Sequence, residues 1–382
     1  MHILQEYSVY LDGCYGLYLL AALLLFVGYE VVYYLVLCVT LRRDVVVRQK
    51  EQPGVSVIVC AHNEEENLRD YLHTLLNQDY PCYEVIVVDD GSEDNSQMIL
   101  KQYAREYNNL YLTFVPNGAR VISSKKLALT IGIKASHYDY ILLTDADCRP
   151  ESCKWICEMM SGFSDEKTEL VLGFSPYFDH RSWLSNLISY DTLVTGMQYL
   201  TMARHGHAYM GVGRNMAYRK QTFFDHNGFQ GLLNERAGDD DLFVNKITTR
   251  NNTAVVCSKQ SLTWSAPKRT WSEWVQQKRR HLSVSSHYNT KNKLRVGLEP
   301  LVRGLMYSMI IVCAILGGMY AFIALTLWAL RITTQLIAVN ICAKRWGLRN
   351  FGLEVILHDI FLPLITLYLL LTKRIYKQQI YW

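Results

Sequence analysis

Two carboxylates separated by one residue follow a short apolar run near the middle of the chain. The run covers residues 140–143, and Asp145 and Asp147 come just after it. Successive side chains of a strand point to opposite faces, so the two carboxylates can take separate roles where the strand ends. Mg²⁺ and Mn²⁺ are bound by a few carboxylate oxygens together with water and substrate phosphate. The pair therefore predicts a divalent-cation site for diphosphate chemistry at the end of a strand.

Two earlier apolar runs also end in polar side chains. Residues 55–60 are followed by Asn63 and Glu64, and residues 83–88 are followed by Asp89. A helical pattern comes after each run, and this alternation is typical of a parallel sheet covered on both faces. Ligands of such sheets bind at the carboxyl ends of the strands. We therefore expect these polar residues and the aspartate pair to converge on one site.

The strand ends also have structural explanations. Asp90-Gly91-Ser92 suits a tight turn, and Asp94 or Asn95 suits a helix cap. Asp89 is harder to explain in this way, because two adjacent carboxylates repel one another unless donors approach them. Ribose hydroxyls and the N–H of a pyrimidine ring are such donors. Asp89 therefore remains a candidate for nucleoside recognition.

Charged residues further along the chain extend the candidate site. Lys125 and Lys126 open a predicted helix, where the helix dipole disfavours cations, so an anionic ligand explains them better than solvation does. Asp239 and Asp241 would crowd Asp240 and raise its proton affinity, which suits a general base near neutral pH. A solvated acidic loop is the alternative for this triplet.

The ends of the chain are apolar enough to enter a membrane. Residues 15–39, 304–330 and 351–372 are long apolar runs, and Gly317-Gly318 divides the second into a predicted helical hairpin. No Lys or Arg precedes the first run, so a cleaved signal peptide fits it less well than a membrane span does. Glu30 is costly in lipid, and we expect it to face neighbouring helices.

Basic residues indicate the orientation of the spans. The basic residues that follow the first apolar run place the middle of the chain in the cytoplasm. The basic residues that precede the last apolar run predict a cytoplasmic connection. A third group after the last run also favours the cytoplasm, so three spans plus one re-entrant or surface helix are an alternative to four crossings. The three groups are Arg42, Arg43 and Arg48; Arg331, Lys344, Arg345 and Arg349; and Lys373, Arg374 and Lys377.

Charge and cysteine usage exclude other classes of protein. The formal net charge of +4 suits contact with an anionic leaflet, and no basic run indicates nucleic acid. The ten cysteines contain no Cys-x-x-Cys pair, which favours reduced, structural thiols. A zinc site built from Cys148, Cys153 and Cys157 would lack the usual paired spacing.

Taken in order, the motifs resemble the membrane-bound family 2 glycosyltransferases of GT-A fold, in particular hyaluronan and poly-N-acetylglucosamine synthases. The residues that carry the resemblance lie between Val55 and His281 and comprise 57–65, 87–92, Lys125-x-x-Ala128-Leu129, Asp145-Ala146-Asp147, 238–241 and Gln277-x-x-Arg280-His281. His281 stands where tryptophan is usual in the family. A second register of the last motif would use Gln276 and Arg279 instead.

The resemblance implies roles for individual residues. Asp240 would be the catalytic base, and Asp147 would hold the metal ion, Mg²⁺ or Mn²⁺. The donor nucleotide would be bound by Asn63, Glu64, Asp89, Lys125, Asp145, Gln277 and Arg280. The acceptor side of the pocket would be lined by Gly213, Arg214, Asn215, Asp239 and His281. Residues 211–218 hold two of the glycines that let backbone approach a ligand closely, with a simple glycine turn as the alternative.

The predicted fold is α/β, a GT-A (Rossmann-like) cytoplasmic catalytic domain with transmembrane helices at both ends. We expect an anchor over residues 1–45, the catalytic domain over 53–293, and transmembrane and interfacial helices over 300–382. The implied reaction is an inverting, metal-dependent transfer of a sugar from a nucleotide diphosphate sugar, for which a UDP-sugar is the main expectation. The acceptor would be a glycan or glycolipid at the inner face of the plasma membrane. One-step transfer to a lipid carrier and a non-catalytic role in a glycan export complex are the alternatives.

Overall fold

The computed structural model describes residues 14–42, 52–116, 124–233 and 237–372. Five basic residues used above to orient the spans lie outside the described residues, namely Arg43, Arg48, Lys373, Arg374 and Lys377.

A seven-stranded sheet forms the centre of the catalytic region, in the order β3-β2-β1-β4-β7-β6-β8. The strands are β1 (Val55–Ala61), β2 (Tyr83–Asp89), β3 (Leu110–Phe114), β4 (Tyr140–Asp145), β6 (Leu170–Leu172), β7 (Met216–Arg219) and β8 (Thr253–Val255). The strands from β3 to β4 are parallel, as the apolar runs predicted. Ala61 of β1 lies opposite Asp89, and Cys60 lies opposite Asp145, so both carboxylates leave the sheet at the same edge.

Side chains of β1 alternate between two apolar layers. Ile58 packs against α5 (Ser124–Ala135), whereas Val57 and Val59 pack on the other face. The helices on that second face are α3 (Glu65–Leu76), α4 (Ser96–Glu106) and α6 (Trp155–Ser161). The strand is therefore buried on both sides, which explains its unbroken apolar sequence.

The predicted parallel order holds from β3 to β4, and β7 departs from it. This four-residue strand pairs antiparallel with β4 and with β6, and Met216 lies opposite Leu143. It follows the long helix α7 (Trp183–Arg204) and the glycine segment 211–213, and antiparallel pairing does not require a helical crossover. Because β7 runs in the opposite direction, its beginning lies at the same edge as the end of β4.

A second, two-stranded sheet continues from this edge. In it, β5 (Cys148–Pro150) pairs with β9 (Thr263–Ser265), and Cys148 lies opposite Ser265. This pairing holds the chain directly after Asp147. Two short helices complete the region, α8 (Lys220–Asp225) and α9 (Asp241–Ile247).

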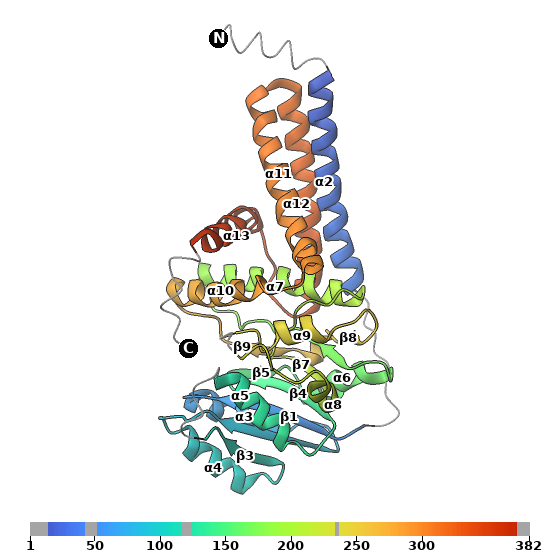
Figure 1. Ribbon diagram of the computed structural model, residues 1–382. Coiled ribbons are helices and arrows are strands. Elements are labelled where there is room, and N and C mark those ends of the chain that lie inside the picture. The colour runs from blue at the N-terminus through green and yellow to red at the C-terminus, as the bar shows by residue number, and fades with distance from the viewer. Residues whose placement is uncertain (1–13, 43–51, 117–123, 234–236, 373–382) are drawn as a thin grey trace.

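Three long helices form a bundle above the catalytic region (Figure 1). They are α2 (Cys14–Leu41), α11 (Thr290–Leu316) and α12 (Gly318–Arg345). The predicted hairpin is confirmed, because α11 and α12 meet at Gly317 and Gly318, whose φ angles are 72° and 52°. Among the described residues, four helices are long and apolar enough to cross a membrane, these three and α13 (Glu354–Leu371).

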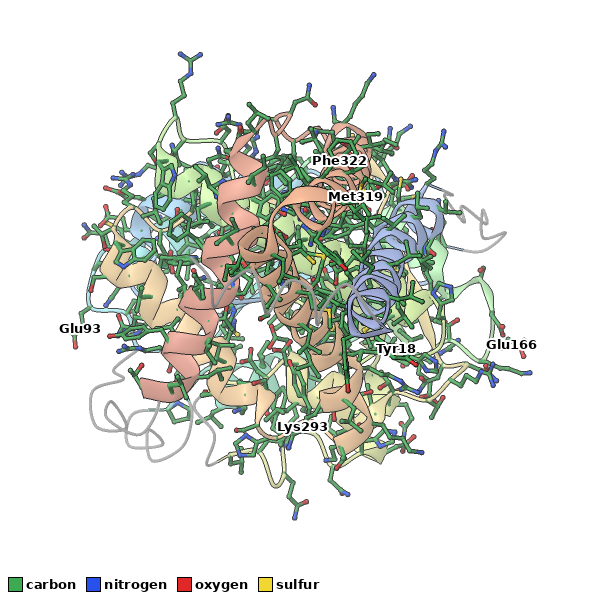
Figure 2. All side chains as sticks on the ribbon, turned by 90° about the horizontal axis from the view of Figure 1, so that it is seen from above. Tyr18, Glu93, Glu166, Lys293, Met319 and Phe322 are labelled. Atoms are coloured by element: carbon green, nitrogen blue, oxygen red, sulfur yellow. The ribbon has the colours of Figure 1, made fainter. Side chains whose placement is uncertain are left out.

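The last of these helices is not parallel to the bundle. Figure 1 shows α13 lying across the bundle direction, above α7 and α10 (Trp271–Ser285), and in the view from above it runs across the picture beside the bundle (Figure 2). Apolar side chains of α13, including Phe361, Leu364 and Leu367, are exposed. This arrangement favours three spans plus one surface helix.

Charged residues are concentrated where the bundle meets α13. Arg331 of α12 is fully buried and pairs with Glu30 at 2.9 Å and with Asp359 at 2.6 Å. Arg303 pairs with Asp359 at 3.0 Å and with Glu299 at 3.1 Å. We call these five residues the buried ionic cluster. The prediction that Glu30 faces neighbouring helices is confirmed.

The assignment of Arg331 to a cytoplasmic connection was wrong. Its guanidinium group is held inside the bundle because two carboxylates compensate the charge that burial would otherwise make very costly.

Candidate active site

The carboxylate of Asp89 ends β2 and is 5% exposed. Its Oδ1 accepts a hydrogen bond from the backbone N–H of Ser92 at 3.0 Å, and its Oδ2 accepts one from Nε2 of Gln97 at 2.7 Å. Each oxygen keeps a second lone pair for a ligand. Gln97 was missed by sequence reasoning, because it lies in the helix after the turn and only the fold brings it back to Asp89.

The side chains of Asn63 and Glu64 have different surroundings. Asn63 has a φ of 56°, accepts from the backbone N–H of Glu93 at 2.7 Å, and donates its own backbone N–H to Ser92 at 3.0 Å. It therefore shapes the loop that carries Asp89. Burial raises the pKa of Glu64, and the nearby charges of Asp147 and Asp145 raise it further. Glu64 thus lies beside the aspartate pair.

Lys125 joins two acidic segments that are far apart in the sequence. Its Nζ lies 2.9 Å from Oδ1 of Asp145 and 3.5 Å from Oδ2 of Asp239. Desolvation would lower the pKa of Lys125, but the two carboxylates outweigh it and hold the pKa well above the ordinary value. The neighbouring Lys126 is fully buried and donates to the backbone carbonyl of Ala237 at 2.9 Å. Both lysines therefore tie α5 to the acidic segment that precedes α9.

Asp147 is held by the small second sheet. Its Oδ2 accepts from the hydroxyl of Ser265 at 2.9 Å, and its Oδ1 accepts from the thiol of Cys148 at 3.2 Å. Within the described residues, no group of three or more His, Cys, Asp or Glu is arranged to hold a metal ion. One or two hard carboxylate oxygens still fit Mg²⁺ or Mn²⁺ when diphosphate and water supply the remaining ligands. Asp147 can supply such oxygens.

Arg214 lies in the segment just before β7. Its guanidinium lies 4.5 Å from the ring centre of Tyr177 and donates from Nη2 to the carbonyl of Ser175 at 3.3 Å. Its Nη1 is buried without a hydrogen-bond partner among the described residues. The hydroxyl of Tyr177 in turn accepts from Nε2 of Gln277 at 3.1 Å. Tyr177 was also missed, because no motif surrounds it.

Asp240 is the N-cap of α9 and receives two backbone hydrogen bonds. Oδ1 accepts from the N–H of Asp241 at 2.8 Å, and Oδ2 accepts from the N–H of Gly213 at 3.0 Å. Burial raises the pKa of Asp240, and the charge of Asp239 raises it further, against the opposing charge of Lys125. The backbone at Gly213 therefore comes close to the side chain of Asp240.

The other two aspartates of the triplet have different surroundings. Burial would raise the pKa of Asp239, but Lys125, Lys126 and Arg280 outweigh it and lower the pKa below the ordinary value. Asp241 is buried and accepts from the hydroxyl of Tyr288 at 3.1 Å. Asp241 therefore belongs to the core, where burial and the charge of Asp240 raise its pKa well above the ordinary value.

The assignment of Asn215 to the acceptor pocket is corrected by its position. Asn215 is fully buried, and its Oδ1 accepts from the indole N–H of Trp155 at 3.0 Å. Its Nδ2 donates to the carbonyls of Phe174 at 2.8 Å and Ser261 at 2.7 Å. All donors of this amide are used inside the core, so Asn215 joins β6, β7 and the segment before β9.

Helix α10 brings the last motif to the site. Gln277 contacts Tyr177, and Arg280 is close enough to Asp239 to contribute to its lowered pKa. Gln277 is half-buried, whereas Gln276 and Arg280 are exposed. His281 follows on the exposed side of the helix.

The mixed sheet with acidic residues gathered at one edge has the arrangement of the GT-A fold. A mannosyltransferase from Pyrobaculum calidifontis, PcManGT, solved in complex with GDP-Man and Mn²⁺, has the same fold with a TM-score of 0.56 and 19% sequence identity, covering 86% of this chain and 99% of that one.

Sequence comparisons point in the same direction. Residues 56–225 match the model of glycosyl transferase family 2. A probable glycosyltransferase of Bacillus subtilis, YdaM, is 24% identical over 374 residues, which cover 87% of this chain and 86% of the relative. A poly-beta-1,6-N-acetyl-D-glucosamine synthase of Staphylococcus epidermidis is 31% identical over 107 residues, which cover 28% of this chain and 25% of the synthase. Residues 56–225 are therefore similar to glycosyl transferase family 2, and the protein is a glycosyltransferase.

Proposed function

We propose that this glycosyltransferase moves a hexose from a nucleotide diphosphate sugar, a UDP-sugar, onto a glycan or glycolipid acceptor at the cytoplasmic face of the membrane. The main observation that supports this proposal is that three acidic segments of the chain converge. Asp145 and Asp239 share Lys125, Asp240 follows Asp239, and Asp89 leaves the sheet at the same edge as Asp145. Such a group of carboxylates and cations suits a nucleoside, a diphosphate and an acceptor hydroxyl.

Donor binding would divide between the two sides of the site. Asp89 would accept from the uracil N–H or a ribose hydroxyl. Arg214 has a buried Nη1 without a partner among the described residues, and Arg280 is exposed beside Asp239, so both can donate to diphosphate oxygens. Forked guanidinium groups stabilise the charge that develops on the leaving diphosphate.

Metal dependence is part of the proposal. PcManGT holds Mn²⁺ with GDP-Man, which supports a divalent cation in this fold. Asp147 would hold the ion here, with Asp145 and Glu64 nearby. A bound Mg²⁺ or Mn²⁺ would neutralise charge on the diphosphate and orient it.

The chemical step would be one in-line displacement. The acceptor oxygen attacks the anomeric carbon while the bond from that carbon to the diphosphate oxygen breaks, so the configuration inverts. Asp240 takes the hydroxyl proton and later releases it to solvent. Its raised pKa suits this role, and the N–H groups of Gly213 and Asp241 orient its two oxygens.

A second candidate is one-step transfer to a lipid carrier. It is favoured by the crosswise position of α13, because only α2, α11 and α12 are then left as parallel helices (Figure 1). Three helices provide little protein to enclose a growing polymer, whereas a single transfer at the leaflet surface requires no channel.

The function can be tested with purified protein in lipid nanodiscs. The protein would be offered radiolabelled UDP-glucose, UDP-N-acetylglucosamine and GDP-mannose, each with Mn²⁺ or with EDTA. We expect metal-dependent transfer from a UDP-sugar, and extraction of the product into organic solvent would distinguish a lipid carrier from a polymer. Transfer from GDP-mannose alone would contradict the UDP assignment, and full activity in EDTA would contradict a metal at Asp147.

The base is tested by Asp240→Asn. This change keeps the size of the side chain but removes the proton acceptor, so we expect kcat to fall by about 10³-fold or more while the Kd for UDP stays within about threefold. The matched control is Asp225→Asn, which changes an exposed aspartate on α8 and should leave kcat unchanged. Unchanged turnover of Asp240→Asn would reject the base assignment.

A further inference from the structure

The helix that carries Gln277 and Arg280 is attached to α7 by a shielded ion pair. Nζ of Lys278 lies 2.7 Å from Oδ1 and 2.6 Å from Oδ2 of Asp191, and each side chain is only 19% exposed. Lys278 directly follows Gln277 and precedes Arg280 by two residues. A shift of this pair would therefore move both donor-site residues.

Apolar packing reinforces the same contact. Trp274 of α10 is buried and packs with Leu187 and Ile188 of α7. The ammonium group of Lys278 lies 6.0 Å from the ring centre of Trp274. The ion pair and the tryptophan together limit sliding of α10 along α7.

The residue next to Asp191 connects α7 to the membrane helices. Tyr190 is buried, and its hydroxyl accepts from Nε2 of Gln335 at 2.7 Å. Oε1 of Gln335 accepts from Arg331 at 2.6 Å, and its Nε2 also donates to Asp359 at 2.9 Å. Through Tyr190, α7 is therefore bonded to the buried ionic cluster of α2, α11, α12 and α13.

Arg280 depends on these contacts for its position. It is exposed, and its guanidinium group makes no hydrogen bond or ion pair with another described side chain. Its place beside Asp239 is consequently set by the helix that carries it. In Figure 1, α7 and α10 lie as a layer between the sheet and the bundle, where they can transmit such a constraint.

We propose that Tyr190 and Asp191 are positioning residues for sugar transfer: Asp191 holds α10 through Lys278, and Tyr190 ties the same turn of α7 to the buried ionic cluster. The inference rests on the proposed function, since it assigns Arg280 to the donor diphosphate. The membrane helices then act on donor affinity although none of them contributes a predicted site residue.

The test uses full-length protein in nanodiscs and the sugar donor identified by the panel above. Asp191→Asn and Lys278→Met should each lower kcat/KM by about tenfold, mostly through a higher KM for the donor, because diphosphate contacts loosen. The charge exchange that combines Asp191→Lys with Lys278→Asp should recover at least about threefold, since opposite charges meet again. Tyr190→Phe keeps the ring and should lower kcat/KM by about threefold.

The control and the readout separate positioning from loss of fold. Arg69→Gln breaks an exposed ion pair with Glu65 on α3 and should leave both constants unchanged. A smaller folded fraction would lower kcat at an unchanged KM, so a raised KM identifies positioning. If melting temperatures show that the charge variants are unfolded, the donor KM of Tyr190→Phe decides whether the positioning role holds.

Two outcomes would overturn the inference. Donor KM values equal to that of the wild type in all the folded variants would remove the positioning role while leaving the proposed function intact. A wild-type protein that transfers no sugar from any donor would reject the proposed function and this inference with it.

Discussion

Two effects act on the carboxyl group of Asp240. It is buried at the start of α9, where desolvation raises its pKa, and the adjacent charge of Asp239 adds to the rise. Lys125 opposes both effects, and it also pairs with Asp239 at 3.5 Å. The proton affinity of Asp240 is thus set by its burial and by the charges of Asp239 and Lys125.

The pH dependence of activity follows from this balance. The base must be deprotonated before transfer, so kcat/KM should fall as pH drops through the raised pKa of Asp240. Asp239→Asn removes a negative charge and frees Lys125, and both changes favour the charged form of Asp240. We expect the acidic limb of the kcat/KM profile to move to lower pH. The profile of Asp225→Asn should match the wild type, and an upward or absent shift in Asp239→Asn would contradict the assignment.

Many residues of the candidate site could be predicted from residue types and their spacing in the sequence. The acidic residues at the ends of β2 and β4 were predicted because an apolar run ends in a carboxylate there. Tyr177, Gln97 and Ser265 were not predicted, because each acts on a residue that only the folded chain brings near. Asn215 was misassigned because a polar residue after glycines is typical of a pocket wall, whereas burial here uses its whole amide.

At the scale of the elements, strands with continuous apolar sequences were the most predictable. β1, β2 and β4 are buried on both faces, so their composition alone distinguishes them. β7 was not predicted as a strand because it has four residues, and its direction depends on pairing with β4 and β6. The role of α13 was left open, since its composition suits a span and a surface helix equally.

Asn215 is the contact that joins several of these elements. Asn215→Ala would leave the indole of Trp155 and the carbonyls of Phe174 and Ser261 without their partner. Each unsatisfied buried group costs about 1–3 kcal/mol, so we expect a loss of about 3 kcal/mol in the free energy of unfolding. Denaturant unfolding monitored by tryptophan fluorescence would measure it. An exposed counterpart, Asn251→Ala, should change stability little, and a stable Asn215→Ala protein would contradict the core assignment.

At the scale of the whole molecule, three layers succeed one another from the bundle to the sheet (Figure 1). The helical bundle is apolar on its outer side, with Tyr18, Met319 and Phe322 exposed (Figure 2). Below it, α7 and α10 form the middle layer, with Trp183 and Trp271 stacked at 6.2 Å and both partly exposed. Tryptophan favours the headgroup depth of a bilayer, so this layer marks the expected position of the leaflet surface.

The crosswise helix gives a prediction about membrane depth. Leu357 and Leu364 of α13 are exposed, and single spin labels at these positions should report nearly equal depth in a bilayer. In a perpendicular span the same two positions would differ by about 10 Å. Labels at Phe322 and Leu330 of α12 are the control and should differ by about 12 Å. Depth measured with oxygen and a nickel chelate would test this, and a 10 Å difference along α13 would support four crossings instead.

The reversed direction of β7 has a consequence for how such enzymes diverge. It lets the segment holding Gly213 and Arg214 enter the reaction edge from the side opposite β2, whose end carries Asp89. Under the proposed function, Asp89 would recognise the nucleoside while Gly213 would line the acceptor side, so the two tasks belong to separate stretches of the chain. Mutation can therefore alter the product of such a catalyst while its donor preference is inherited unchanged.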